Sequence, residues 1–205
     1  MLPIPQWLTE LIAVISNLAI AVAAVFGIVG LWQWRAELVG KTKFEAARKM
    51  ILLALQFRDE YDRARNAWTY LAESASRKKS DNEHPGESFV LNEHYARWQR
   101  LQPLQETLRK LHEVSWEAEV LLSEDDARLI QPFETMYQDL FLAIDSYFEY
   151  LLEQAKSPLR DIREGEGGQI KSWRKIIYGA RGDEVSASVD NAANKVKRQL
   201  KKYIR

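Results

Sequence analysis

The stretch LIAVISNLAIAVAAVFGIVGLW, residues 11–32, decides the fold. Ser16 and Asn17 are the only polar members among its 22 residues. As a helix it rises about 33 Å, which is enough to cross a hydrocarbon core of about 30 Å. A buried helix of a soluble protein rarely stays apolar on every face for about six turns. The stretch therefore predicts a transmembrane helix, within an anchor that we assign to residues 1–34.

The residues around this stretch predict its orientation. Trp7 stands before it and Trp32 and Trp34 at its end, as is typical of the two membrane interfaces. Glu10 is the only charged side chain before it, whereas a series of bases follows: Arg35, Lys41, Lys43, Arg48 and Lys49. By the positive-inside rule we expect the N-terminus outside the cell and residues 35–205 in the cytoplasm. No later segment is long and apolar enough to cross again, so we expect a single pass.

A cleaved signal peptide is the main alternative, because Ala21-Val22-Ala23 resembles a small-residue cleavage site. Residues 1–10 hold no Lys or Arg, however, and nine more apolar or small residues follow Ala23. We therefore expect the helix to be retained as an anchor.

The apolar stretch also contains a stripe of small residues at helical spacing. Small side chains at spacings of three and four let two membrane helices approach closely, and an amide in hydrocarbon favours a polar partner. The stripe predicts self-association in the membrane, and hence a homo-oligomer, through Ser16, Asn17, Ala19, Ala23, Gly27 and Gly30. Because Ala and Gly are common in membrane helices, a stripe without any role is the alternative.

The rest of the chain has apolar residues at helical spacing and no sustained alternation with a period of two. We therefore predict an all-α fold, with a cytoplasmic antiparallel bundle of long helices over residues 35–205. The inward positions that we expect are Met50, Leu53, Phe57, Tyr61, Ala64, Trp68 and Leu71; Trp98, Leu101, Leu104, Leu108, Leu111, Ala118 and Leu121 or Leu122; Ile130, Phe133, Leu140, Ile144, Phe148 and Leu151; and Val185, Val189, Ala192, Ala193, Val196 and Leu200.

Glycine, proline and capping residues predict where these helices end. Gly40 is the expected hinge after the membrane helix, 74–88 a flexible loop, and 164–168 a glycine-rich connection. Pro103 predicts a kink or break, Pro132 a bend, and Ser157-Pro158 a helix end. Ser123 with Asp126 resembles a capping box, and Asp183 is expected to cap a basic amphipathic helix over 183–204.

Several short motifs resemble a widespread group of uncharacterised bacterial single-pass membrane proteins. They are Trp34-x-x-Glu37-Leu38-x-Gly40-Lys41, Ala46-Ala47-Arg48-Lys49, Arg58-Asp59, Arg65-Asn66, Glu117-Ala118-Glu119 and the terminal Tyr178, Asp183-Glu184-Val185 and Leu200-Lys201-Lys202-Tyr203-Ile204. The resemblance implies the architecture above and a bacterial inner membrane. It implies no reaction.

The sequence offers little for catalysis, and we expect neither an enzyme nor a cofactor. Without cysteine there is no thiolate metal site or thiol nucleophile. His84, His94 and His112 lack the spacing of helical metal motifs, and no Walker loop or Gly-x-Ser-x-Gly occurs. The one weak enzymatic pattern is Arg77 followed by His84 with six residues between them, a spacing similar to that of small helical ribonucleases.

The neutral total charge hides a strong separation along the chain. Residues 113–168 carry a balance of −10 and residues 169–205 one of +7. The basic end is concentrated in Lys195, Lys197, Arg198, Lys201, Lys202 and Arg205. This face is expected either to be solvated and dock on the chain's own acidic helices, or to bind anionic phospholipid or a protein partner. Nucleic acid is the least favoured partner, because few charges cluster and no aromatic ladder accompanies them.

The tryptophans give one further expectation. Trp68 and Trp98 fall on inward stripes and are expected in the core, whereas Trp116 lies off its stripe. Trp116 is expected to pack in the bundle, with an exposed hot spot as the alternative.

Together these features favour a membrane-anchored interaction or assembly module. The alternatives are an oligomerising membrane effector or sensor of a stress or phage-defence system, and a tethered ribonuclease-like enzyme.

Overall fold

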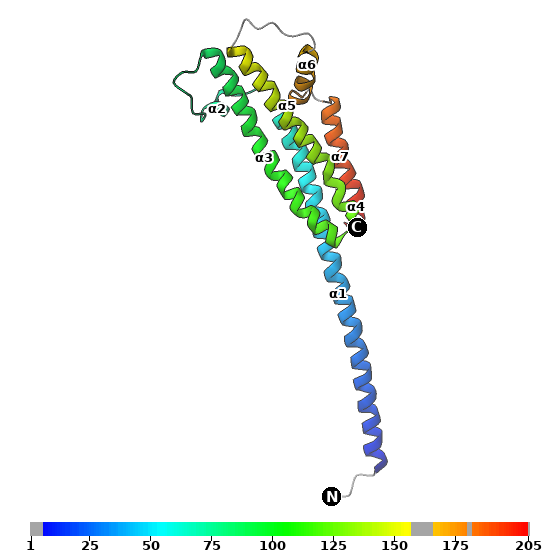
Figure 1. Ribbon diagram of the computed structural model, residues 1–205. Coiled ribbons are helices and arrows are strands. Elements are labelled where there is room, and N and C mark those ends of the chain that lie inside the picture. Colours follow the sequence, from blue (N-terminus) through cyan, green and yellow to red (C-terminus); the bar gives the residue numbers. More distant parts are fainter. Residues whose placement is uncertain (1–5, 157–165, 180–181, 205) are drawn as a thin grey trace. The chain divides into compact units, whose positions relative to one another are not determined.

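The computed structural model describes residues 6–156, 166–179 and 182–204 (Figure 1). These residues form helices and turns, and no strand occurs among them. The predicted all-α class is confirmed.

The chain divides into two compact units, Met1–Phe44 and Glu45–Arg205, and the first helix, α1 (Gln6–Ala64), contributes residues to both. The boundary between these units lies ten residues after the predicted one, which separates the anchor 1–34 from the domain 35–205. The expected hinge at Gly40 is wrong, because α1 continues through it without a break. A single glycine costs a helix only about 1 kcal/mol relative to alanine, which good helix formers on both sides offset.

The first unit holds the apolar stretch. From Ile15 to Gly40 every side chain is exposed. The mean hydropathy reaches 2.1 over an 18-residue window, and α1 is the one helix in the described part of the chain that is long and apolar enough to cross a membrane. The predicted span is thus confirmed in length and composition.

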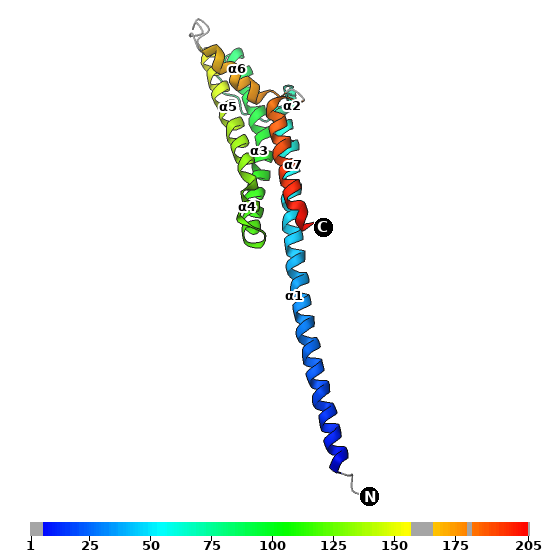
Figure 2. The ribbon, with the colours of Figure 1, turned by 90° about the vertical axis from the view of Figure 1, so that its right-hand side faces the viewer.

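The second unit contains three long helices packed with the last part of α1: α3 (Pro85–Leu121), α5 (Gln131–Lys156) and α7 (Glu184–Leu200). Shorter elements complete it (Figures 1 and 2): α2 (Leu71–Ser74), α4 (Glu124–Ala127), α6 (Glu166–Ile177) and 3₁₀ turns at Arg128–Ile130 and Lys201–Tyr203. The polar contacts show that α3 and α7 are antiparallel to α1. Gln56 meets Thr107 and Lys49 meets Glu117, while Arg65 meets Asp183 and Arg58 meets Asp190.

Most predicted core positions are buried, and they form one cluster. Phe57 of α1 packs edge-on against Phe133 of α5, with ring centroids 5.1 Å apart. The confirmed inward residues are Met50, Leu53, Phe57, Tyr61 and Ala64; Leu101, Leu104, Leu108, Leu111 and Ala118; Ile130, Phe133, Leu140, Ile144 and Phe148; and Val189, Ala192, Ala193, Val196 and Leu200.

The three tryptophan expectations are wrong. Because α1 ends at Ala64, the stripe does not continue, and Trp68 and Leu71 are 78% and 93% exposed. Trp98 lies at the rim of the core and is 41% exposed, although its ring contacts Phe141. Trp116 is 64% exposed, which favours the hot-spot alternative over packing in the bundle.

Several predicted boundaries also shift. α3 starts at Pro85, within the predicted loop, because proline suits the first turn of a helix. It then continues through Pro103, so a break there is wrong. The bend predicted at Pro132 corresponds to a boundary between two elements, because the 3₁₀ turn ends at Ile130 and α5 begins at Gln131. Gly167 and Gly168 are helical in α6. Residues 164 and 165 of the predicted connection lie outside the described residues, and so does the predicted helix end at Ser157-Pro158.

Both predicted caps are confirmed. Ser123 Oγ accepts from the Asp126 amide at the start of α4, and Asp183 accepts from the Ser186 amide at the start of α7.

Arg65 joins three helix ends at a buried site just after α1. Its side chain is 1% exposed, and all five N–H donors are used. Nε donates to the carbonyl of Ile176 at 2.7 Å, and Nη2 to that of Lys175 at 3.0 Å, which caps the end of α6. The two Nη atoms form an ion pair with Asp183 (2.7 and 3.1 Å), and Nη1 also donates to Ser186. These hydrogen bonds from Arg65 hold the pKa of Asp183 well below its usual range.

The backbone at Gly179 also packs closely against Arg65. The Gly179 amide donates to the Arg65 carbonyl at 2.9 Å. A Cβ at Gly179 would lie 3.2 Å from the guanidinium carbon, closer than ordinary contact. Glycine therefore lets the chain pass close to the arginine, and a larger residue would need the guanidinium to shift by a few tenths of an ångström.

A second buried ion, Asp126, fixes the other end of α7. It is fully buried, and its oxygens accept from Ser123, Gln199, Lys202 and Tyr203 at 2.7–3.2 Å. Burial opposes ionisation, but the four donors outweigh it and lower the pKa of Asp126.

Substitution Arg65→Met should lower the free energy of unfolding by about 3–5 kcal/mol, because it removes the cation paired with Asp183 and leaves two carbonyls without their donors. Urea unfolding of the full chain in detergent micelles, followed by circular dichroism, measures this. Exposed Arg63→Gln is the control and should change stability by about 0.5 kcal/mol or less. A loss below about 1 kcal/mol for Arg65→Met would show that Arg65 does not hold the helix ends together.

Candidate functional site

The predicted basic residues divide into two groups. Lys195, Lys197, Arg198 and Lys201 are exposed, and no ion pair joins them to another described residue. Lys202 instead lies 3.2 Å from Asp126, so docking on the chain's own acidic residues is confirmed for this one side chain. Arg205 lies outside the described residues.

The predicted association stripe lies along the apolar part of α1. Ser16, Asn17, Ala19, Ala23, Gly27 and Gly30 are all helical and exposed. A Cβ built on Gly27 or Gly30 meets no atom within 4 Å. Self-association through this stripe stays a prediction, and the open space makes it easy to test.

Arg77 and His84, the two residues of the weak ribonuclease pattern, are not paired with each other. Both Nη atoms of Arg77 donate to Glu83 at 2.6 and 2.9 Å, and Nε donates to Asn92 at 2.7 Å. His84 is exposed and occupies the N-cap position of α3. Arg77 therefore ties the segment before α3 to the helix itself, and the predicted flexible loop is held by an ion pair.

The other histidines have structural neighbours. His112 lies 3.2 Å from Glu134, and His94 stacks on Phe148, where burial lowers its pKa. No group of three or more metal-binding side chains occurs among the residues that the structure describes.

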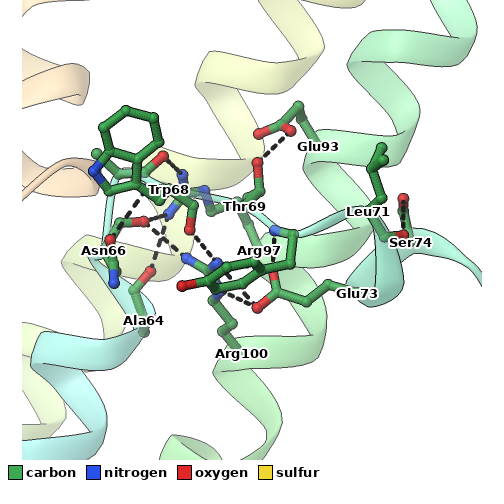
Figure 3. Close-up of polar contacts among 12 residues, drawn as sticks. Ala64, Asn66, Trp68, Thr69, Leu71, Glu73, Ser74, Glu93, Arg97 and Arg100 are labelled. Carbon is green, nitrogen blue, oxygen red and sulfur yellow. Dashed lines mark hydrogen bonds and ion pairs between the residues drawn. The ribbon is translucent and has the colours of Figure 1, made fainter.

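The most distinctive exposed feature is the segment 66–70 after α1, which we name the Trp68 loop. Two arginines of α3 hold its backbone (Figure 3). Arg97 is fully buried, and its Nη atoms donate to the carbonyls of Asn66 and, at 3.0 Å, Ala67. Its guanidinium also lies 5.0 Å from the ring centre of Tyr178, and burial lowers its pKa.

Arg100 supplies the second support, one turn further along α3. It donates to the carbonyls of Asn66 (2.8 Å) and Trp68, and pairs with Glu73 at 2.7 Å (Figure 3). Within the loop, the Trp68 amide donates to the Asn66 side chain at 3.0 Å. The loop thus carries no regular structure of its own, yet arginines bind three successive carbonyls.

This fixed backbone presents large apolar side chains to solvent. Trp68, Tyr70 and Leu71 are 78%, 67% and 93% exposed. Beside them lies an open hollow of about 580 Å³, whose lining includes Tyr70, Glu73 and Arg100. Exposed aromatic residues on a backbone held by hydrogen bonds, next to a hollow, are typical of a protein-binding hot spot. Chemically, the arrangement can bind a partner, and Arg100 and Glu73 in the lining are occupied in holding the loop.

The sequence analysis missed this site because it extended the α1 stripe through Trp68 and Leu71. One signal was available: Arg97 and Arg100 stand one turn apart on a stripe that is otherwise apolar.

Comparison with protein families, curated proteins and solved structures found no match for the chain. The functional argument therefore depends on the site itself.

Replacing Arg97 with Met should release the Trp68 loop while the helices remain. Loss of two charge-assisted hydrogen bonds is expected to speed amide hydrogen exchange across residues 66–72 by at least about tenfold. Exchange read by mass spectrometry checks this, with exposed Arg109→Gln as the control. Unchanged exchange would show that the loop is ordered without Arg97.

Gly27→Leu should weaken self-association in the membrane several-fold, because a large side chain keeps two stripes apart. A two-hybrid assay for membrane helices measures this, with Val25→Leu, on the opposite side of the helix from the stripe, as the control. Equal signals from both variants would show that the helices do not associate through the stripe.

Proposed function

We propose that this chain is a membrane-anchored interaction and assembly module of a bacterial inner membrane, with its N-terminus outside and its helical domain in the cytoplasm. The observation that carries the proposal is the Trp68 loop with the first residue of α2. Together they expose Trp68, Tyr70 and Leu71, and two buried or half-buried arginines hold the loop backbone. Exposed groups of this size are costly in water, and a partner that covers them recovers this energy.

The rigidity of the loop supports a binding role. A loop that is already ordered loses little conformational entropy when it binds, so more of the contact energy appears as affinity. Burying Arg97 without a carboxylate partner among the described residues is expensive, and the structure uses this charge to hold the carbonyls of Asn66 and Ala67. The orientation of the chain rests on the bases that follow the apolar stretch.

A photo-crosslinking experiment tests the proposal. With p-benzoylphenylalanine in place of Tyr70, irradiation of intact cells is expected to give a discrete adduct between the chain and one other protein. Substitution Trp68→Ala in the same chain should reduce the adduct at least about fivefold, since a hot-spot truncation costs about 1 kcal/mol or more.

The same crosslinker at Leu142, an exposed apolar position on α5, is the matched control. The absence of an adduct from position 70, or the same adduct from position 142, would contradict a partner at the Trp68 loop. Carbonate extraction of the membranes would show separately whether the chain is anchored.

A further inference from the structure

A second exposed aromatic surface lies near the end of α3 and carries acidic residues. Trp116 and Val120 are 64% and 85% exposed and stand one turn apart. Glu117 and Glu119 are exposed beside them. We name these four residues the Trp116 surface. The sequence had offered an exposed hot spot as the alternative for Trp116.

The complementary surface is the basic face of α7, defined as Lys195, Lys197, Arg198 and Lys201. The opposite side of α7 is buried through Val189, Val196 and Leu200, so these bases point outward. Lys195 shares a shallow hollow with Asp125. The other three bases have no acidic partner among the described residues, although α3, α4 and α5 are rich in acids.

Both surfaces lie at the same end of the second unit. Glu117 is 3.6 Å from Lys49, close to the start of the α1 segment in this unit. The end of α7 is bound to Asp126, only five residues beyond α3. Figures 1 and 2 show α3 and α7 on different flanks of the bundle, and no hydrogen bond or ion pair joins these two helices in the described ranges.

We propose that a second copy of this chain occupies the Trp116 surface with the basic face of its α7. This rests on the anchoring in the proposed function, because anchoring holds the copies at a high effective concentration in one membrane. The acidic Trp116 surface of one copy can then meet the basic face of another. Arg198 can stack on Trp116, and lysine stems can cover Val120 while their ammonium groups meet Glu117 and Glu119.

The anchor also explains how a polar contact of this kind suffices. Single exposed ion pairs are weak and screened by salt. Confinement to a membrane raises the effective concentration of copies, so weak contacts are populated. The contact joins different surfaces of the two copies, so a repeating arrangement gives a ring or an open row.

Disulfide crosslinking in inside-out membrane vesicles tests the contact, since the chain has no cysteine of its own. Val120→Cys and Asn194→Cys are placed in separate copies of the full chain with different tags. Both positions are exposed; Val120 belongs to the Trp116 surface, and Asn194 adjoins the basic face of α7. Mild oxidation is expected to give a crosslink between the two tags.

The control pair is Leu142→Cys with Ala187→Cys, exposed positions on α5 and on the first half of α7, which should give little crosslink. Adding Lys197→Glu and Arg198→Glu, or Trp116→Ala, should lower the crosslink between positions 120 and 194 at least about fivefold. Raising salt to about 0.5 M should lower it too.

No crosslink between positions 120 and 194 would overturn the proposal, as would one that charge reversal and salt leave unchanged. If Asn194→Cys is instead protected from a maleimide reagent only in vesicles rich in anionic lipid, the basic face binds lipid and the proposal fails. Carbonate extraction distinguishes these results from a failure of anchoring, and the Trp68 crosslink tests the partner site separately.

Discussion

The second unit depends on one constraint: the charged guanidinium of Arg65, buried among three helix ends, needs acceptors for its N–H groups. Arg65 meets it by binding the last carbonyls of α6 and the capping carboxylate of α7 from the end of α1. A lysine carries its three donors on a single nitrogen, so it could not reach acceptors spread around the edges of a planar guanidinium. The guanidinium therefore both neutralises Asp183 and sets where three helices end.

This constraint also explains the Trp68 loop. The Arg65 carbonyl accepts from the Gly179 amide instead of from a further turn of α1, and the peptide groups after it need other partners. Arg97 and Arg100 of α3 supply them. Arg97 and Arg100 thus replace the donors that a further helical turn would have supplied to these carbonyls, and the apolar residues that this turn would have carried inward face solvent.

The sequence predicted what depends on periodicity. The apolar stretch, the buried stripes around Phe57, Leu104 and Ile144, and the caps at Ser123 and Asp183 are local patterns, and the structure contains them. It failed where a distant residue overrides a local pattern. Trp68 continues the α1 stripe in spacing, but its environment is decided by arginines about 30 residues later. Pro103 is tolerated because the packing of α3 outweighs one lost hydrogen bond.

The separation of charge has a related explanation. The acids near the end of α3 and the bases of α7 attract each other, yet the core places them on different flanks, because each helix must turn its apolar side inward. Only Asp126, which follows α3 through a tight turn, reaches α7. The remaining charges stay exposed at one end of the bundle. In a freely diffusing protein such surfaces would favour only weak contacts, whereas copies anchored in one membrane meet repeatedly in a single orientation, so the same weak attraction is enough to select an arrangement.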